Sequence, residues 1–313
     1  MEVQPRYINM DKIAHKNVAW IDLTSPGENE IALLQKEYGI SHLPLHEITV
    51  ETPLPKIERF ENEIYAVLYF PIFNPQKRAT EGKEVDFIIT KDVLVTVHYE
   101  PIPPLTGVRN TYLDSPEAKD SGFSNTTAHL LFKILSQMYA YSLRELSHVK
   151  KNLDSLNEDL FDRNGREFAR RILEVRRDIL NFRRTLAPQR HFLELLELKS
   201  SDLLGRKSKQ SFEDLLEAYD SVWGLLASYQ EAIEAIHETN NTLLASKQND
   251  TIQTLTMLSV ISFYLTMIAA VFGMNALYEP IIGTPYDFWK IIGIMTVVTI
   301  GLIMFFRKKG WLN

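Results

Sequence analysis

The sequence contains no cysteine, and this absence excludes disulfide bonds and thiolate metal sites. It also lacks a phosphate-binding glycine loop, a nucleophile elbow and a paired-carboxylate motif, so we expect neither an enzyme nor an organic cofactor. The formal net charge of −6 gives no reason to expect a nucleic acid as partner. The N-terminus has no long apolar run, which predicts that there is no cleavable signal peptide.

Charge is missing from two stretches near the C-terminus. Residues 255–274 carry no charged side chain, and at 1.5 Å per residue they extend about 30 Å, the thickness of a bilayer core. Residues 288–306 carry one charge, Lys290, near their start, where a lysine can reach the interface. We therefore predict two transmembrane helices. The alternative is a pair of buried core helices, which we disfavour because uncharged runs of this length are rare in soluble domains.

The charges that flank these stretches predict their orientation. A basic tail at residues 307–313 contains Arg307, Lys308 and Lys309. The connecting loop at residues 275–287 contains Glu279 and Asp287 and has no lysine or arginine. The positive-inside rule then places the loop outside and the tail in the cytoplasm. Two crossings return the N-terminal part to the cytoplasm, so we expect a multi-pass protein of the cell (inner) membrane.

The first part of the chain, residues 1–122, has the pattern of a cytoplasmic α/β domain. Short runs of β-forming residues occur at 18–23, 64–69, 85–90 and 93–98. Helices are predicted at 26–38 and 44–50. Prolines 101, 103 and 104 indicate a break after the last strand. The fold class is therefore α+β, with this domain ahead of helical and transmembrane parts.

Residues 123–254 have the pattern of a helical stalk or funnel. One amphipathic helix is predicted over 126–160 and a second over 166–198, bent at Pro188. A third helix is predicted to begin at Ser211, which has the character of an N-cap.

This third helix has few residues that could end it. Between Ser211 and Gly273 there is no proline and only one glycine, which predicts a continuous helix of about 63 residues and roughly 95 Å. It would continue into the first transmembrane stretch. A helix of this length needs neighbours, so we expect a bundle or an oligomeric stalk.

A stripe of residues with helical spacing runs along this helix, with offsets of 11, 3, 3, 8 and 3. It comprises Glu238, Asn249, Ile252, Leu255, Phe263 and Thr266, with Thr256 and Ser259 on or beside it. A polar stripe in a spanning helix should face protein or water. Repeated around an axis, it would form polar rings that hold water and an ion, and apolar rings at Ile252 and Leu255 that gate by dewetting. Alternatively, the hydroxyls bond back to their own helix and the apolar members pack against a neighbour.

The end of the first span carries Gly273-Met274-Asn275, followed by a short loop, a second span and the tail Arg307-Lys308-Lys309-Gly310-Trp311-Leu312. The soluble part contains Trp20-Ile21-Asp22, Pro55-Lys56, Phe60-Glu61-Asn62 and Thr90-Lys91. In this order, the motifs resemble the CorA metal-ion transporter family over nearly the whole chain. The resemblance implies a homopentamer that carries Mg²⁺, often with Co²⁺ or Ni²⁺. It also implies that the first span, with the stripe, lines the pore and that Asn275 forms a ring at the outer mouth.

The resemblance further implies a regulatory Mg²⁺ site between subunits. Asp214 matches an acidic position of such a site, and its partner would be Glu81 or Glu84, expected before the third of the four predicted strands. The outer loop departs from the family pattern, because it reads Tyr278-Glu279-Pro280-Ile281, with Glu279 in front of the proline. An acidic loop should still concentrate cations.

Two other functions remain open. One is a Zn²⁺ transporter of the same fold, with or without proton coupling, although Met274 favours Mg²⁺ because zinc-transporting relatives usually vary there. The other is a membrane-anchored coiled-coil scaffold that does not conduct. The polar stripe and Gly273-Met274-Asn275 favour a channel, since a plain anchor needs neither.

Overall fold

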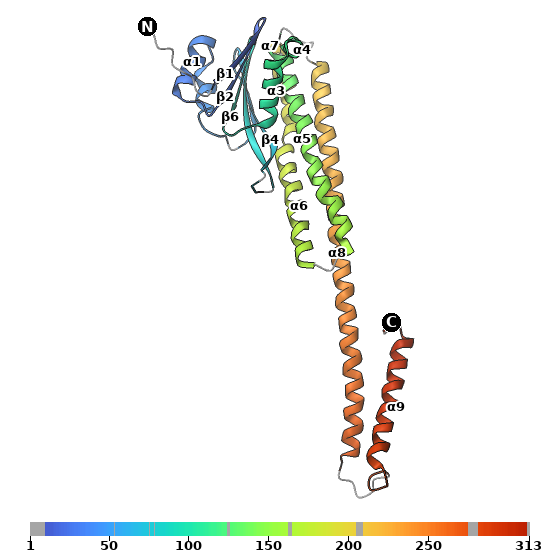
Figure 1. Cartoon of the computed structure of the whole chain (residues 1–313). Helices are drawn as coiled ribbons and strands as arrows, with labels where there is room; N and C mark the ends of the chain where they lie inside the picture. Colours follow the sequence, from blue (N-terminus) through green and yellow to red (C-terminus); the bar gives the residue numbers. More distant parts are fainter. Residues whose placement is uncertain are drawn as a thin grey trace. The chain divides into compact units, whose positions relative to one another are not determined.

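A computed structural model describes residues 10–52, 54–74, 76–77, 79–123, 126–161, 165–204, 209–274 and 281–311. The described residues belong to two compact units, one within residues 1–237 and one within 238–313 (Figure 1). The domain boundaries predicted at 122 and 254 stay predictions.

The first unit contains a six-stranded sheet in the order β1-β2-β6-β5-β4-β3. Its strands are β1 (Met10–His15), β2 (Val18–Thr24), β3 (Lys56–Arg59), β4 (Glu63–Asn74), β5 (Ala79–Thr90) and β6 (Val93–His98). Only β2 and β6 pair in parallel, and all other neighbours are antiparallel. The four predicted strands are confirmed. The two strands that were not predicted, β1 and β3, lie at the edges of the sheet, are short, and carry polar or charged residues.

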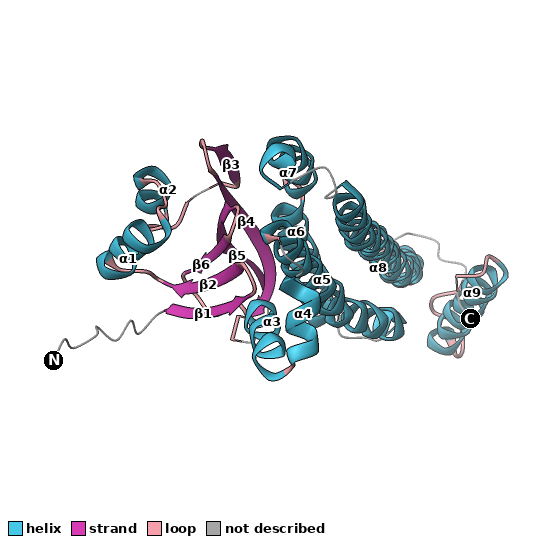
Figure 2. Cartoon of the chain, turned by 90° about the horizontal axis from the view of Figure 1, so that it is seen from above, coloured by secondary structure: helices cyan, strands magenta, loops and turns pink. Residues whose placement is uncertain are grey.

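Both faces of the sheet are covered, because strand residues alternate between two apolar layers. On one face, Val67 and Ile88 pack with α1 (Glu28–Tyr38) and α2 (His42–Glu47). The helical layer covers the other face (Figure 2). Side chains such as Phe70 of the sheet pack in that layer's apolar core. The predicted first helix is confirmed.

The helical layer consists of α3 (Pro103–Asp114), α4 (Pro116–Phe123), α5 (Thr127–Glu158), the 3₁₀ turn η1 (Asp159–Phe161), α6 (Gly165–Leu186), α7 (Gln189–Leu204) and the first half of α8 (Lys209–Phe272). The predicted helix over 126–160 is confirmed, with the Thr126 hydroxyl accepting from the His129 N–H at 3.3 Å. The predicted break after β6 is present, but Pro103 and Pro104 also begin α3, where a missing N–H costs nothing.

The single helix predicted over 166–198 is wrong. Pro188 separates α6 from α7 because its ring cannot continue a helix that has already formed.

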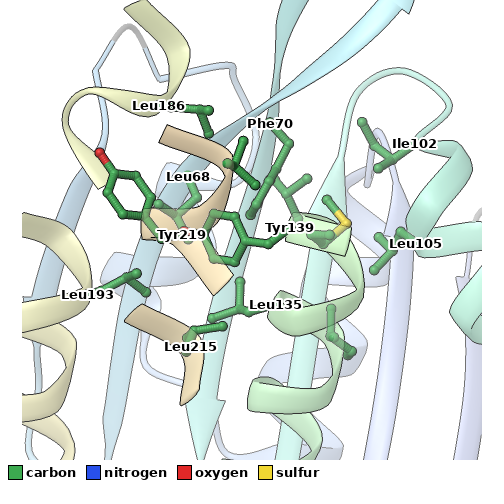
Figure 3. Close-up of a cluster of buried hydrophobic side chains, with 14 of the residues drawn as sticks. Leu68, Phe70, Ile102, Leu105, Leu135, Tyr139, Leu186, Leu193, Leu215 and Tyr219 are labelled. Carbon is green, nitrogen blue, oxygen red and sulfur yellow. The ribbon is translucent and has the colours of Figure 1, made fainter. Parts of the chain in front are cut away.

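The long helix α8 spans 64 residues without interruption, as the absence of helix breakers predicts. The N-cap prediction for Ser211 is wrong, because α8 includes Lys209 and Ser211 lies inside its first turn. The buried side chains of the first half recur at spacings of three and four, with one step of seven, and form a seam: Phe212, Leu215, Tyr219, Val222, Leu226, Ile233, Ile236 and Asn240. This spacing is that of a helix packed along a bundle. Tyr219 meets Tyr139 of α5 with ring centroids 6.0 Å apart (Figure 3).

A buried polar chain connects β2 and β6. The Trp20 Nε1–H donates to the Thr96 hydroxyl at 2.9 Å, and that hydroxyl donates to Asp22 Oδ1 at 2.6 Å. All three residues are buried. Trp20 and Asp22, noted in the sequence as a motif, therefore serve the interior of the sheet.

A second polar contact joins α5, α6 and β5. The Asp178 carboxylate on α6 accepts from the Thr80 backbone N–H at 2.6 Å and lies 2.6 Å from His148 Nε2. Burial by itself would lower the pKa of His148, but Asp178 outweighs burial and raises it. Burial would raise the pKa of Asp178, but His148 and the Thr80 N–H lower it. The ion pair thus joins α5 to α6, and the Thr80 N–H ties Asp178 to β5.

Candidate functional site

Two helices are long and apolar enough to cross a membrane, within residues 210–272 of α8 and along α9 (Asp287–Lys308). The chain itself buries only 6% of the most apolar segment of the first helix and none of that of the second. Phe263 and Trp289 are 64% and 68% exposed. Apolar surface on this scale requires lipid or further subunits to cover it. The fold is therefore that predicted, an α/β domain with helices and two C-terminal candidate membrane spans.

The polar ends of α9 have local partners. At its start, the Lys290 ammonium donates to the Thr284 hydroxyl at 3.0 Å, so the single charge of this span reaches back toward the loop. At its end, Arg307 and Lys308 occupy the last turn. Lys309 follows, with its ammonium 5.9 Å from the ring centroid of Trp311. Cationic side chains at a helix C-terminus interact favourably with the helix dipole.

All six residues of the predicted stripe lie on α8, and all are exposed: Glu238, Asn249, Ile252, Leu255, Phe263 and Thr266. Because successive helical residues turn by 100°, Glu238, Asn249 and Phe263 lie within about 20° of one line. Ile252 lies about 40° from that line, Thr266 about 80° and Leu255 about 100°. The stripe is thus one face of the helix, narrow at its polar end and broader within the apolar segment.

A shallow hollow lies along this face and is lined only by α8. Its residues are Ile252, Leu255, Thr256, Ser259, Val260, Phe263 and Tyr264. The Thr256 and Ser259 hydroxyls each donate to the backbone carbonyl four residues earlier, at 2.8 Å. Thr266 does the same to Ser262 at 2.8 Å. The alternative interpretation of these hydroxyls, back-bonding to their own helix, is confirmed, and it leaves their oxygen lone pairs as acceptors.

The Gly273-Met274-Asn275 motif follows the last helical residue of α8. The Gly273 N–H donates to the Ala269 carbonyl at 2.9 Å. A β-carbon at Gly273 would lie 3.1 Å from the same oxygen, a tight fit that favours glycine at the helix end. Met274 is 61% exposed. Asn275 and Glu279 lie outside the described residues.

The carboxylates predicted to regulate transport have different surroundings. Asp214 is exposed on α8 and accepts from Gln210 at 3.5 Å. Glu81 lies inside β5 rather than before it, because β4 and β5 extend as a long hairpin beyond β6. It contacts the ammonium groups of Lys77 at 2.5 Å and Lys83 at 3.2 Å. Hydrogen bonding to Lys77, above all, lowers the pKa of Glu81 to about 2.

Glu84 is also inside β5, and it is buried. It accepts from the Thr52 N–H at 2.8 Å and from the Tyr69 hydroxyl at 2.7 Å. Two residues on, Asp86 accepts from Tyr65 at 3.1 Å, and burial together with Glu84 raises the pKa of Asp86 to about 8. The sequence reasoning missed this pair, although a two-residue offset in a strand places both on one face. Among the described residues, no three His, Asp or Glu side chains are arranged to hold a metal.

Comparisons with known proteins agree with this architecture. A model of the family "CorA-like Mg²⁺ transporter protein" matches residues 15–308. The cobalt/magnesium transport protein CorA of Methanocaldococcus jannaschii is 26% identical over 99% of this chain and 96% of its own length. The protein of the same name from Thermotoga maritima is 21% identical over 94% of this chain and 83% of its own.

The solved structure of the M. jannaschii CorA magnesium transporter superposes with a TM-score of 0.83, and the match covers 96% of this chain and 94% of that one. The sequence identity in this match is 26%. With the family model covering nearly the whole sequence, the fold and the order of motifs have one explanation: the chain belongs to the CorA family of Mg²⁺ transporters.

Proposed function

We propose that this chain is one subunit of a homo-oligomeric channel that admits Mg²⁺, and also Co²⁺ or Ni²⁺, down the electrochemical gradient. The pore is lined by α8, and α9 lies on the lipid side. Relatives named as cobalt/magnesium transport proteins support the choice of ion. The number of subunits, five, comes from the family resemblance.

The observation that carries the proposal is the exposed face of α8. It combines Asn249 and Thr266 with apolar Ile252 and Phe263 in a helix that the chain does not cover. Thr266 lies within the predicted span, where a lipid-facing surface gains nothing from a polar group, whereas a water-filled pore requires polar groups. Asn249 continues the same face on the cytoplasmic side of the span. Mg²⁺ gives up its water reluctantly, so neutral acceptors can bind the hydrated ion without trapping it. Asn275 would supply such a ring at the outer mouth.

Reconstitution tests the proposal directly. Purified full-length protein in liposomes that contain a Mg²⁺-sensitive dye should give Mg²⁺ uptake, and Asn275→Ala should reduce the rate. Intact wild-type protein that admits no divalent ion would support the scaffold. Zn²⁺ uptake that follows an imposed proton gradient would support the zinc transporter instead.

We propose that cytoplasmic Mg²⁺ regulates the channel by neutralising Asp214 of one subunit and Glu81 of the next. Asp214 is exposed and the Glu81 side chain is 25% exposed, and at Glu81 the Mg²⁺ ion would replace the ammonium groups of Lys77 and Lys83. Glu84 fits this role less well, because it is buried and accepts hydrogen bonds from Thr52 and Tyr69 in the interior. Asp214→Ala should weaken inhibition of the current by cytoplasmic Mg²⁺. The neighbouring Glu213→Ala, which is equally exposed, is the control. Equal inhibition in wild type and Asp214→Ala would rule this site out.

We also propose that both termini face the cytoplasm. The absence of cysteine makes this testable, since a single introduced cysteine is the only thiol in the protein. In intact cells, an impermeant thiol reagent should label Thr284→Cys in the loop and should not label Gly310→Cys in the tail. The reverse pattern would invert the topology.

A further inference from the structure

Two hydroxyl residues interrupt the apolar part of the α8 face. Ile252 and Phe263 are 60% and 64% exposed and lie eleven residues apart, which is about 16 Å along the helix. Thr256 and Ser259 lie between them, both exposed and both part of the hollow that the apolar residues line. Thr256 is eighteen residues from Glu238, or five full turns, so the two share one line of the helix. Thr256 is therefore closer to the line of Glu238 than Leu255, which lies about 100° from it.

The direction of their hydrogen bonds decides what these hydroxyls can recognise. Each donates its only hydrogen to a carbonyl of its own helix, Thr256 to Ile252 and Ser259 to Leu255, both at 2.8 Å. The oxygen lone pairs remain for a ligand that donates. A hydrated divalent cation is such a ligand, because its water oxygens bind the metal and only hydrogens point outward. An anion, which needs donors, finds none here.

We propose that Thr256 and Ser259 form an intermediate station in the channel, where a ring of hydroxyl oxygens binds the hydrated cation between two apolar constrictions. This inference rests on the proposed channel and on α8 lining it. The station keeps water in the middle of an apolar stretch of about 16 Å, which would otherwise lose its water and stop conduction. Neutral hydroxyls also hold the ion weakly enough to release it.

The test compares hydroxyl removal on this face with the same change elsewhere on α8. The double variant Thr256→Val/Ser259→Ala keeps the approximate volume and loses the acceptors. Thr254→Val is the matched control, because the Thr254 hydroxyl makes the same back-bond, to Asp250 at 2.9 Å, and lies about 160° from Glu238 on the helix. All proteins are reconstituted as full chains into dye-loaded liposomes, after size-exclusion chromatography shows the same oligomer.

The double variant should lower Mg²⁺ uptake at least tenfold, while Thr254→Val stays within twofold of wild type. The conservative variants Thr256→Ser and Ser259→Thr retain a hydroxyl and should retain most of the uptake. If the double variant fails to assemble, the single variant Thr256→Val serves, with a smaller decrease expected in the same direction.

If the double variant assembles and takes up Mg²⁺ as fast as a conducting wild type, the proposed hydroxyl station is contradicted, while the proposed channel still stands. An equal loss in Thr254→Val also overturns it, because the effect then belongs to the helix and not to this face. If wild-type protein does not conduct, the proposed channel function is contradicted, and this is a separate result.

Discussion

The two halves of α8 carry similar apolar side chains in opposite environments. In the first half, Leu226 and Tyr219 are 0% and 2% exposed against the other helices of the layer. In the second half, Leu255 and Leu258 are both 58% exposed, although the helix continues without a break. The chain completes the core of its first unit by itself. The second half has to find its packing partners in lipid or in other copies of the chain.

The largest expected effect separates the two halves by the same substitution. Leu226→Ala should lower the free energy of unfolding by about 2–5 kcal/mol, because it opens a cavity in a filled core. Leu258→Ala should change it by less than about 0.5 kcal/mol, because Leu258 is 58% exposed in the chain and lies about 160° from Glu238, on the side of α8 that detergent covers. Guanidinium unfolding of detergent-solubilised protein, followed by tryptophan fluorescence, measures both. A similar loss in the free energy of unfolding at the two positions would contradict the difference between the two halves of α8.

A smaller effect is expected when a threonine is replaced in each region. Thr96→Val should cost about 1–3 kcal/mol, because it leaves the buried Trp20 N–H and the Asp22 carboxylate without this partner. Thr254→Val should cost less than about 0.5 kcal/mol, because Thr254 is exposed and its hydroxyl bonds only to the preceding turn. The same denaturation experiment provides the measurement. A Thr96→Val protein as stable as wild type would show that the buried chain contributes nothing.

The smallest effect concerns the ion pair that fixes the helical layer. His148→Gln should cost about 1–2 kcal/mol in acidic buffer, since it removes the charged partner of Asp178. The pKa of His148 is raised, so its stabilisation is complete below its ordinary pKa and is lost as pH rises through the raised one. The pKa of Asp178 is lowered, so the stability that ionised Asp178 contributes is lost only as pH falls through that lowered value.

The difference in Tm between wild type and His148→Gln should therefore be largest near about pH 5.5 and shrink toward alkaline pH. Differential scanning calorimetry across that range provides the readout. A difference that grows with pH would mean that His148 acts as a neutral side chain and not as the cation of the pair.

Much of the fold could be predicted because its signals are local. The absence of breakers after Ser211 predicted α8, and the β-rich runs predicted β2, β4, β5 and β6. The three-and-four spacing of the buried seam was also present in the sequence and could have shown how α8 packs. The edge strands β1 and β3 gave little signal, because short polar strands resemble loops.

The rest depends on contacts between distant residues. Nothing near Glu84 in the sequence shows that Thr52 occupies its oxygens, thirty-two positions away. Nor does a stripe of residues show where each hydroxyl hydrogen points, which decides what Thr256 and Ser259 can bind. Pro188 was expected to bend a helix, but whether a proline bends or divides depends on the packing on either side.

The continuity of α8 has a mechanical consequence. In 64 residues the helix contains no proline and a single glycine, Gly224, so it has no built-in joint where bending or twisting could be absorbed. A helix without such a joint resists local bending and twisting along its length. Rotation by one residue's angle, about 100°, would exchange the Thr256 face for another. In the proposed channel, rotation of this rigid helix would change which side chains line the pore without any hinge.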